Sequence, residues 1–294
     1  AATGLTWLVA RALGRSLVRD VDAIYEVADA VAAGKLDARV GARAKGSIET
    51  KLLAQRMDGM IERLEELVAS QRAFISNAAH ELRSPLTSLR GELELALRRE
   101  RTAPEYKETI ETALADAVAL VTLADDLLAI ARIENRRGNA AKDLTRVADL
   151  VEEASRMSRG NAKARKVEVI VSAPEKDVAV SCSRKEVARA LRNLLDNAIA
   201  HSPNGNRVSV KTVVEDGHVD IAVEDQGPGV RTEDAGLLFA PFWRGTGERA
   251  GAEGAGLGLA LAREIARAEG GDIAFDAAHS PGARFVLTLP LRAA

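Results

Sequence analysis

The chain has 294 residues, which is enough for two or three domains. Charged residues make up 29% of it, aromatic residues 3% and hydrophobic residues 47%, a composition that favours long helices and coiled coils over a large aromatic core. The net charge of −2 and the lack of a basic tract argue against direct nucleic-acid binding. The single cysteine, Cys182, excludes an internal disulfide and suits a reducing cytoplasm; at the end of a short apolar run it is expected to be a small buried filler, not a nucleophile.

The first residues carry an apolar run around Trp7 that is about half of the ~20 residues needed to cross a membrane. Arg11, Arg15 and Arg19 follow it, as positive charges follow a membrane span on its cytoplasmic side. We therefore expect residues 1–13 to be the inner end of a truncated transmembrane helix in the inner (cytoplasmic) membrane, with the rest of the chain on the cytoplasmic side. A short amphipathic helix is the alternative.

Two heptad patterns follow, over residues 14–33 and 53–74, and they predict two helices. The stretch between them begins at Gly34 and ends at Gly41, which interrupt the pattern. Residues 14–69 are therefore predicted to be helix, connector and helix, with the second helix running on into the next domain. A plain coiled-coil linker is the alternative.

Residues 70–137 are predicted to form a helical hairpin. In its first helix Phe74, Ala78, Leu82, Leu86 and Leu89 form an apolar line. His80 is turned roughly 200° from that line and points outward, with Glu81 beside it.

Pro85 is unusual inside so regular a helix, because it removes a backbone hydrogen bond. The second helix opens near Pro104 and repeats apolar residues from Ile110 to Ala131 at spacings of four and three. Two such helices cannot bury both apolar stripes alone, so we expect a homodimeric four-helix bundle with His80 on its outside.

Residues 138–146 are polar and glycine-containing and are predicted to be a linker. Residues 147–294 then alternate helical and strand-like segments and are predicted to form an α/β sandwich domain. The expected helices cover residues 147–158, 184–200 and 257–269, and the expected strands cover 167–171, 178–181, 207–214, 219–224, 272–276 and 284–289.

Several motifs of this last domain are suited to a nucleotide. Asn193 and Asn197 are one helical turn apart, and two amides there can hold a hydrated metal and a phosphate without adding negative charge. Asp225 follows a strand and precedes Gly227 and Gly229. Its carboxylate can accept a hydrogen bond from an exocyclic amine, and the two glycines allow the backbone to approach a flat ring closely.

The stretch from Gly254 to Gly258 opens a helix, and glycines at a helix N-terminus form an anion site. The polar run from Gly245 to Gly254, which follows Phe242 and Arg244, is suited to be a lid. Each of these motifs alone would more often be a turn or a solvated helix face.

The phosphoacceptor box of bacterial transmembrane sensor histidine kinases resembles one short motif of this chain, His80-Glu81-Leu-Arg-Ser84-Pro85-Leu. The motifs of residues 147–294 resemble, in order and spacing, the asparagine, first glycine, phenylalanine and second glycine boxes of the ATP-binding domain of these kinases. This GHKL-type domain is shared with gyrase, a heat-shock chaperone and a mismatch-repair protein. Residues 14–69 resemble a HAMP signal-relay domain, with Glu49 near its acidic position but without the glycine that usually follows.

The resemblance covers residues 14–294 and implies ATP and Mg²⁺ as cofactors. It implies that Asp225 binds the adenine amino group and that Asn197 coordinates the metal. The full set that it places at ATP is Asn193, Asn197, His201, Asp225, Gly227, Gly229, Phe242, Arg244, Gly254, Gly256, Leu257 and Gly258. Two departures stand out: Ala200 replaces a basic residue, and the stretch Ser280-Pro281-Gly282-Ala-Arg284-Phe285 lacks the second glycine of the usual final box, which we expect to matter little.

The implied function is an ATP-dependent protein-histidine kinase of a two-component system. Its His80 attacks the γ-phosphoryl group with Glu81 as general base, and the phosphohistidine then passes the group to an aspartate of a response regulator. The family often also dephosphorylates the regulator, and Ser84 stands at the position used for this.

The rivals are a GHKL-type ATPase, disfavoured because Asn193 replaces the glutamate that activates water, and a non-catalytic signalling scaffold, disfavoured by the intact motifs. Phosphorylation within one chain or across the dimer depends on the handedness of the turn around Arg101–Pro104.

Overall fold

The computed structural model describes residues 4, 7, 21–41, 48–98, 100, 102–136, 142–172, 178–215, 217–245 and 254–291. The chain forms two compact units, Ala1–Asn77 and Ala78–Ala294. The predicted inner end of a transmembrane helix lies, apart from residues 4 and 7, outside the described residues. Among the residues that are described, no helix combines the length and the apolar character needed to cross a membrane.

The first unit contains a helix over residues 21–32, a connector and the beginning of helix α2 (Ile48–Leu97). Its core consists of Val27, Val40, Ala54 and Ile61, so the connector residue Val40 is buried between the two helices that the heptads predicted. Asp58 of α2 holds the connector in place, because its carboxylate accepts hydrogen bonds from the backbone N–H groups of Val40 (2.7 Å) and Gly41 (2.9 Å).

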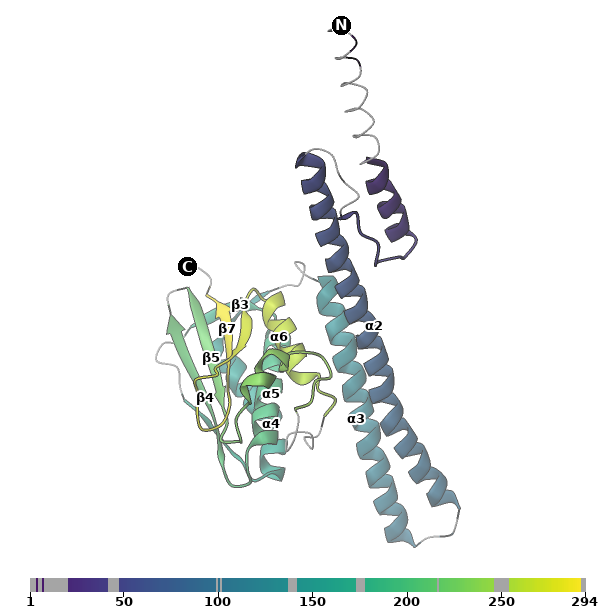
Figure 1. Ribbon diagram of the computed structural model, residues 1–294. Coiled ribbons are helices and arrows are strands. Elements are labelled where there is room, and N and C mark those ends of the chain that lie inside the picture. Colours follow the sequence, from purple (N-terminus) through teal and green to yellow (C-terminus); the bar gives the residue numbers. More distant parts are fainter. Residues whose placement is uncertain are drawn as a thin grey trace. The chain divides into compact units, whose positions relative to one another are not determined.

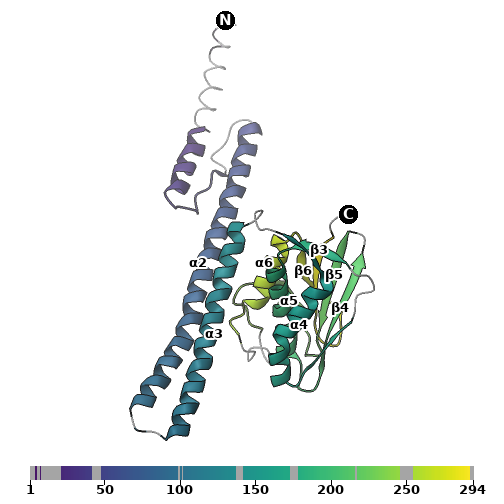
Figure 2. The same cartoon turned by 180° about the vertical axis from the view of Figure 1, so that it is seen from behind.

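In the second unit, α2 and helix α3 (Ala103–Arg136) run side by side in opposite directions (Figure 1, Figure 2). Helix α2 continues through Pro85 as one helix. A capping box begins α3: the backbone N–H of Thr102 and its hydroxyl both donate to the carboxylate of Glu105, at 2.7 and 2.9 Å.

The rest of the second unit is an α/β domain. Its elements are β1 (Asp143–Arg146), α4 (Val147–Ala164), β2 (Glu168–Val171), β3 (Ala179–Cys182), α5 (Arg184–His201), β4 (Arg207–Glu215), β5 (His218–Glu224), η2 (Thr232–Leu237), α6 (Gly258–Ala268), β6 (Asp272–Phe275) and β7 (Arg284–Pro290). The sheet has the order β2-β4-β5-β7-β6, with β2 and β4 parallel and the other neighbours antiparallel. Helices α4, α5 and α6 cover one face of it (Figure 1, Figure 2).

The predicted fold class is confirmed as long helices followed by an α/β domain with a mixed sheet. Each predicted helix and strand of this domain is present, with α4 six residues longer than expected, ending at Ala164 instead of residue 158. Strand β1 was not expected, because it lies in the stretch predicted to be a linker; it pairs with β3 and has only one buried residue, Thr145. Cys182 is 1% exposed, and burial, followed by the charge of Glu269, raises the pKa of its thiol to about 11, so the thiol stays protonated at neutral pH as expected for a filler.

The Asp58 contacts predict a local effect on the connector. Replacing Asp58 by alanine removes both acceptors, and hydrogen bonds to a charged group contribute about 1.5–3 kcal/mol each, so amide exchange at Val40 and Gly41 should accelerate by roughly tenfold or more. Asp58→Asn, which keeps one acceptor oxygen, should have an intermediate effect. Glu65→Ala is the control, since Glu65 pairs with the side chain of Arg39; equal acceleration in both alanine variants would contradict the assignment.

Candidate active site

The two asparagines of α5 lie on one half-buried face of the helix. The opposite face is fixed in the core by Leu191, Leu194 and Leu195, each at most 1% exposed. The side-chain nitrogen Nδ2 of Asn193 donates to the backbone carbonyl of Gly258, the first residue of α6, at 3.1 Å. This hydrogen bond joins two of the predicted motifs, which are 65 positions apart in the chain.

Asp225 follows β5 and is only 3% exposed. Its Oδ1 accepts hydrogen bonds from the backbone N–H groups of Gly227 (2.8 Å) and Ala283 (3.0 Å), and its own N–H donates to the carbonyl of Ala283 at 2.9 Å. The two donors fix the orientation of the carboxylate. Ala283 supplies only backbone groups to this contact.

Gly282 allows this close approach. It has φ +89°, and a Cβ atom there would overlap the backbone carbonyl oxygen of Asp225. Gly227 is similarly confined, since its Cβ would lie 2.5 Å from the carbonyl oxygen of His201. Gly282 was not among the predicted site residues; the glycine in the Ser-Pro-Gly turn was the only sequence signal that could have identified it.

Beside this site, Glu224 ends β5 and joins three strands. Its carboxylate lies 2.7 Å from Nζ of Lys211, 3.0 Å from the hydroxyl of Ser209 and 3.4 Å from Nε of Arg284. Burial alone would raise the pKa of Glu224, but the hydrogen bonds from Lys211 and Ser209 and the charges of Lys211 and Arg284 outweigh it and lower the pKa. Glu224 is therefore a stable anion, and it anchors the strand from which Asp225 projects.

The phenylalanine motif and the second glycine motif meet through their backbones. The N–H of Phe242 donates to the carbonyl of Gly256 at 3.0 Å, and Phe242 has an unusual positive φ of 64°. Gly256 has φ +69°, and a Cβ there would lie 2.7 Å from the carbonyl oxygen of Trp243. The segments on either side of the predicted lid, from Gly245 to Gly254, are thus joined, while residues 246–253 of that lid lie outside the described residues.

The N-terminus of α6 is suited to an anion. Leu257 occupies the N-cap position and supplies no side-chain hydrogen bond to the helix. The first N–H groups of an α-helix have no partner within it, so they can bind phosphate oxygens. Asn197 offers one neutral oxygen ligand of the type that Mg²⁺ accepts when phosphates supply others, so the donor set fits a nucleotide-bound Mg²⁺.

The remaining predicted nucleotide residues border this region in different ways. His201 is the last residue of α5 and contributes its backbone carbonyl beside Gly227. Gly229 has φ +73° and packs against the carbonyl of Gly282. Leu257 is 1% exposed, so its side chain belongs to the core. The side chain of Arg244 is exposed. Gly254 has a positive φ of +123°.

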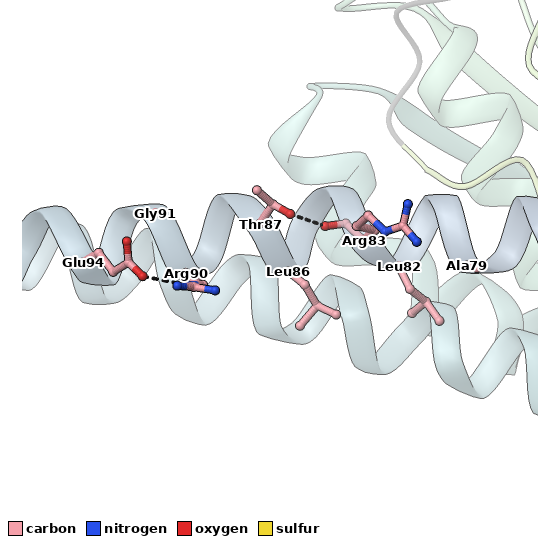
Figure 3. Close-up of a pocket in the computed structure, with 8 residues that line it drawn as sticks. All are labelled: Ala79, Leu82, Arg83, Leu86, Thr87, Arg90, Gly91 and Glu94. Carbon is pink, nitrogen blue, oxygen red and sulfur yellow. Dashed lines mark hydrogen bonds and ion pairs between the residues drawn. The ribbon is translucent and has the colours of Figure 1, made fainter.

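His80 lies on α2, with its side chain exposed as predicted; Glu81 is half-buried and Ser84 is exposed one turn further on. A shallow groove begins next to His80 on the same helix, lined by Ala79, Leu82, Arg83, Leu86, Thr87, Arg90, Gly91 and Glu94 (Figure 3). Leu82 and Leu86 project to the same side of α2 in this view, and two other lining residues, Arg90 and Glu94, form an ion pair (2.6 Å). The phosphoacceptor motif and the nucleotide motifs are thus on separate elements, and the latter converge.

Two family profiles match the chain. The profile described as "His Kinase A (phospho-acceptor) domain" matches residues 70–136. The profile described as "Histidine kinase-, DNA gyrase B-, and HSP90-like ATPase" matches residues 182–293.

Curated relatives match both parts together. The chain is 33% identical over 290 residues to the signal transduction histidine-protein kinase/phosphatase MprB of Mycolicibacterium smegmatis, covering 95% of this chain and 57% of the relative. It is 31% identical over 250 residues to the sensor protein IrlS of Burkholderia pseudomallei, covering 84% of this chain and 53% of the relative. The chain therefore spans about half the length of the curated relatives it matches.

Solved structures are similar as well. The Acinetobacter baumannii histidine kinase AdeS matches with a TM-score of 0.57 and 27% identity, over 73% of this chain and 98% of that chain. The histidine kinase ThkA, solved in complex with the response regulator protein TrrA, matches with a TM-score of 0.60 over 77% of this chain and 64% of that chain; at 19% identity this likeness concerns the fold alone.

The close contact between Gly282 and Asp225 predicts that any side chain at position 282 destabilises the fold and disturbs the site. Gly282→Ala should lower the free energy of unfolding by about 2–4 kcal/mol and abolish nucleotide binding, because both backbone strain and overlap with the Asp225 carbonyl must be relieved. Gly205→Ala is the matched control: Gly205 has φ +86° but open space around the added Cβ, so it should lose only about 1–2 kcal/mol and keep the site. Chemical denaturation and nucleotide titration measure both effects, and equal losses would argue against the steric role of Gly282.

Proposed function

The chain belongs to the sensor histidine kinases that carry a HisKA and a HATPase_c domain, and we propose that it transfers the γ-phosphoryl group of ATP to His80 and then to an aspartate of a response regulator. The observation that carries the proposal is the convergence of the asparagine, aspartate and glycine motifs on one site, in a chain that presents His80 on an exposed helix face. The family supports a response regulator as the partner that receives the phosphoryl group.

In the proposed site each group of the chain has one task. Asp225, held by Gly227 and Ala283, accepts a hydrogen bond from the adenine amino group. The N–H groups at the start of α6 bind phosphate oxygens, and Asn193 keeps that helix start against α5. When bound, Mg²⁺ would be held by Asn197 and the phosphates and would neutralise charge that develops on them.

The acceptor in the proposed reaction is the neutral imidazole of His80. A bond forms between one imidazole nitrogen and the γ-phosphorus, the bond from that phosphorus to the bridging oxygen breaks, and ADP leaves. Glu81, the neighbouring carboxylate, takes the imidazole proton. Positioning and charge stabilisation supply most of the rate enhancement in phosphoryl transfer, which suits a site built mainly from backbone N–H groups and amides.

We also propose a homodimer. Ile110, Leu114, Val121 and Leu128 lie along α3 at spacings of four and seven, and each is 52% to 62% exposed in the single chain. A surface stripe of this length and character is costly in water, and a second copy of the hairpin would bury it in a four-helix bundle. The HisKA match supports the same assembly.

The N-terminal unit is proposed to be a HAMP-like relay, which the buried connector residue Val40 and the helix–connector–helix order support. The curated relatives are about twice as long as this chain and include sensor kinases, so we propose that the relay connects to a membrane span and that the described domains face the cytoplasm of the inner membrane.

Incubation of the chain with Mg²⁺ and γ-labelled ATP tests the main proposal. The protein should acquire label that is labile in acid and stable in alkali, and His80→Gln should acquire none. Asp225→Asn should still label, but with ATP affinity reduced by about 10- to 100-fold, because it alters a hydrogen bond to a charged group. Omission of Mg²⁺ or addition of a chelator should abolish labelling.

Each other outcome of this experiment selects a different function. ATP hydrolysis without labelled protein would support a GHKL-type ATPase. Nucleotide binding with neither label nor hydrolysis would support a signalling scaffold. Undiminished labelling of His80→Gln would exclude His80 as the acceptor.

A second activity, dephosphorylation of the regulator, is favoured by the exposed Ser84 one turn after His80 and by the kinase/phosphatase description of MprB. Ser84→Ala should slow dephosphorylation of the phosphorylated regulator by about tenfold or more, since positioning of the attacking water would be lost, while His80 still becomes labelled. Ser88→Ala, at an exposed position one turn further on, is the control. If both variants dephosphorylate the regulator at the wild-type rate, Ser84 has no such role.

A further inference from the structure

Arg263 lies on α6, in the turn that follows the proposed phosphate-binding start of that helix. Its guanidinium forms a two-pronged ion pair with Asp272 at the beginning of β6: Nε lies 2.8 Å from Oδ1 and Nη2 lies 3.0 Å from Oδ2. Parallel hydrogen bonds of this kind fix the plane of the guanidinium as well as its position. The Arg263 hydrogen bonds also lower the pKa of Asp272 to about 2, so the carboxylate stays charged at all physiological pH values.

The guanidinium of Arg263 lies over the ring of Phe239, with Cζ 4.5 Å from the ring centroid. Phe239 also meets Phe285 edge-on, with 6.2 Å between the centroids. Phe285 is a β7 residue that is 2% exposed, so it belongs to the core. The Phe239 ring therefore contacts both the core and a cation that is itself held by Asp272.

Phe239 stands three residues before Phe242, where the N–H group donates to Gly256. The segment from Phe239 to Phe242 is thus attached at two places. One is the backbone contact between Phe242 and Gly256, which lies just before α6, and the other is the contact between Phe239 and Arg263 on α6 itself. Two attachments fix both the position and the direction of a segment, whereas one contact leaves it free to pivot.

We infer that Arg263 is a positioning residue for nucleotide binding, which acts through Phe239 to hold the segment from Phe239 to Phe242 against the phosphate-binding end of α6. The inference rests on the proposed function, because it concerns the affinity of the same ATP site. Arg263 touches no reacting group in this arrangement, so its loss should weaken ATP binding while leaving the rate at saturating ATP unchanged.

The test compares Arg263→Lys with Arg267→Lys. Arg267 shares the Asp272 carboxylate, with Nε 3.2 Å from Oδ1, and pairs with Glu264, so both variants keep a positive charge beside the same anion. Arg263→Lys removes the guanidinium that lies over Phe239 and should raise the Kd for ATP by about 3- to 10-fold, while Arg267→Lys should stay within about twofold. The labelling rate of His80 at saturating ATP should stay within about twofold in both.

Variants of Phe239 test the route of the effect. Phe239→Leu should weaken ATP binding to the same degree as Arg263→Lys, and the two together should be no worse than either alone, because they remove one shared contact. Phe239→Tyr keeps the aromatic ring and should bind ATP with wild-type affinity. This series remains decisive even if Arg263→Lys folds poorly.

Equal ATP affinity in Arg263→Lys and Arg267→Lys would overturn the inference, as would additive losses in the double variant. A reduced labelling rate at saturating ATP would also overturn it, since that result requires a role in the chemical step. Failure of the wild-type chain to bind ATP would instead refute the proposed function, and this outcome is visible before any variant is compared.

Discussion

The nucleotide site depends on one constraint: the buried carboxylate of Asp225 must be satisfied by backbone N–H groups. An unpaired carboxylate that is only 3% exposed would be strongly destabilising, so Gly227 and Ala283 must both reach Oδ1. The register of the sheet makes this possible, because Glu224 and Arg284 are paired across β5 and β7 and the segment before Arg284 then passes directly beside Asp225. Gly282 is required there because the backbones approach too closely for a side chain.

The proposed phosphate-binding end of the site is assembled in a similar way, mainly from contacts to backbone groups instead of a large side-chain network. The side chain of Asn193 links α5 to the start of α6 by a hydrogen bond to the carbonyl of Gly258, and the carbonyl of Gly256 accepts a hydrogen bond from the N–H of Phe242. The core faces of both helices are buried and anchor these contacts. A site made of fixed N–H groups and neutral amides can receive a triphosphate without first displacing an internal anion, and it needs little reorganisation when charge moves during transfer.

Local patterns in the sequence predicted most of the elements and the main motifs, because helix periodicity and the i, i+4 spacing of Asn193 and Asn197 depend on neighbouring residues only. The sequence did not predict contacts that join distant segments. Ala283 and Asp225 are 58 positions apart, and the local sequence does not show that a Cβ at Gly282 would meet a carbonyl whereas one at Gly205 would meet open space. Strand β1 was missed for the same reason, since its four residues become a strand only by pairing with β3.

The amide of Asn193 also bears on which acceptor receives the phosphoryl group. In the proposed mechanism a carboxylate at this position could take a proton from water and start hydrolysis, whereas an amide cannot. Here Nδ2 is already committed to the carbonyl of Gly258, so the side chain has a structural partner that a carboxylate, which lacks a hydrogen to donate, could not provide. A carboxylate would also be repelled by that carbonyl and by the triphosphate. In the proposed mechanism, the residue that holds the start of α6 against α5 therefore cannot act as a base for water, which favours transfer of the phosphoryl group to His80.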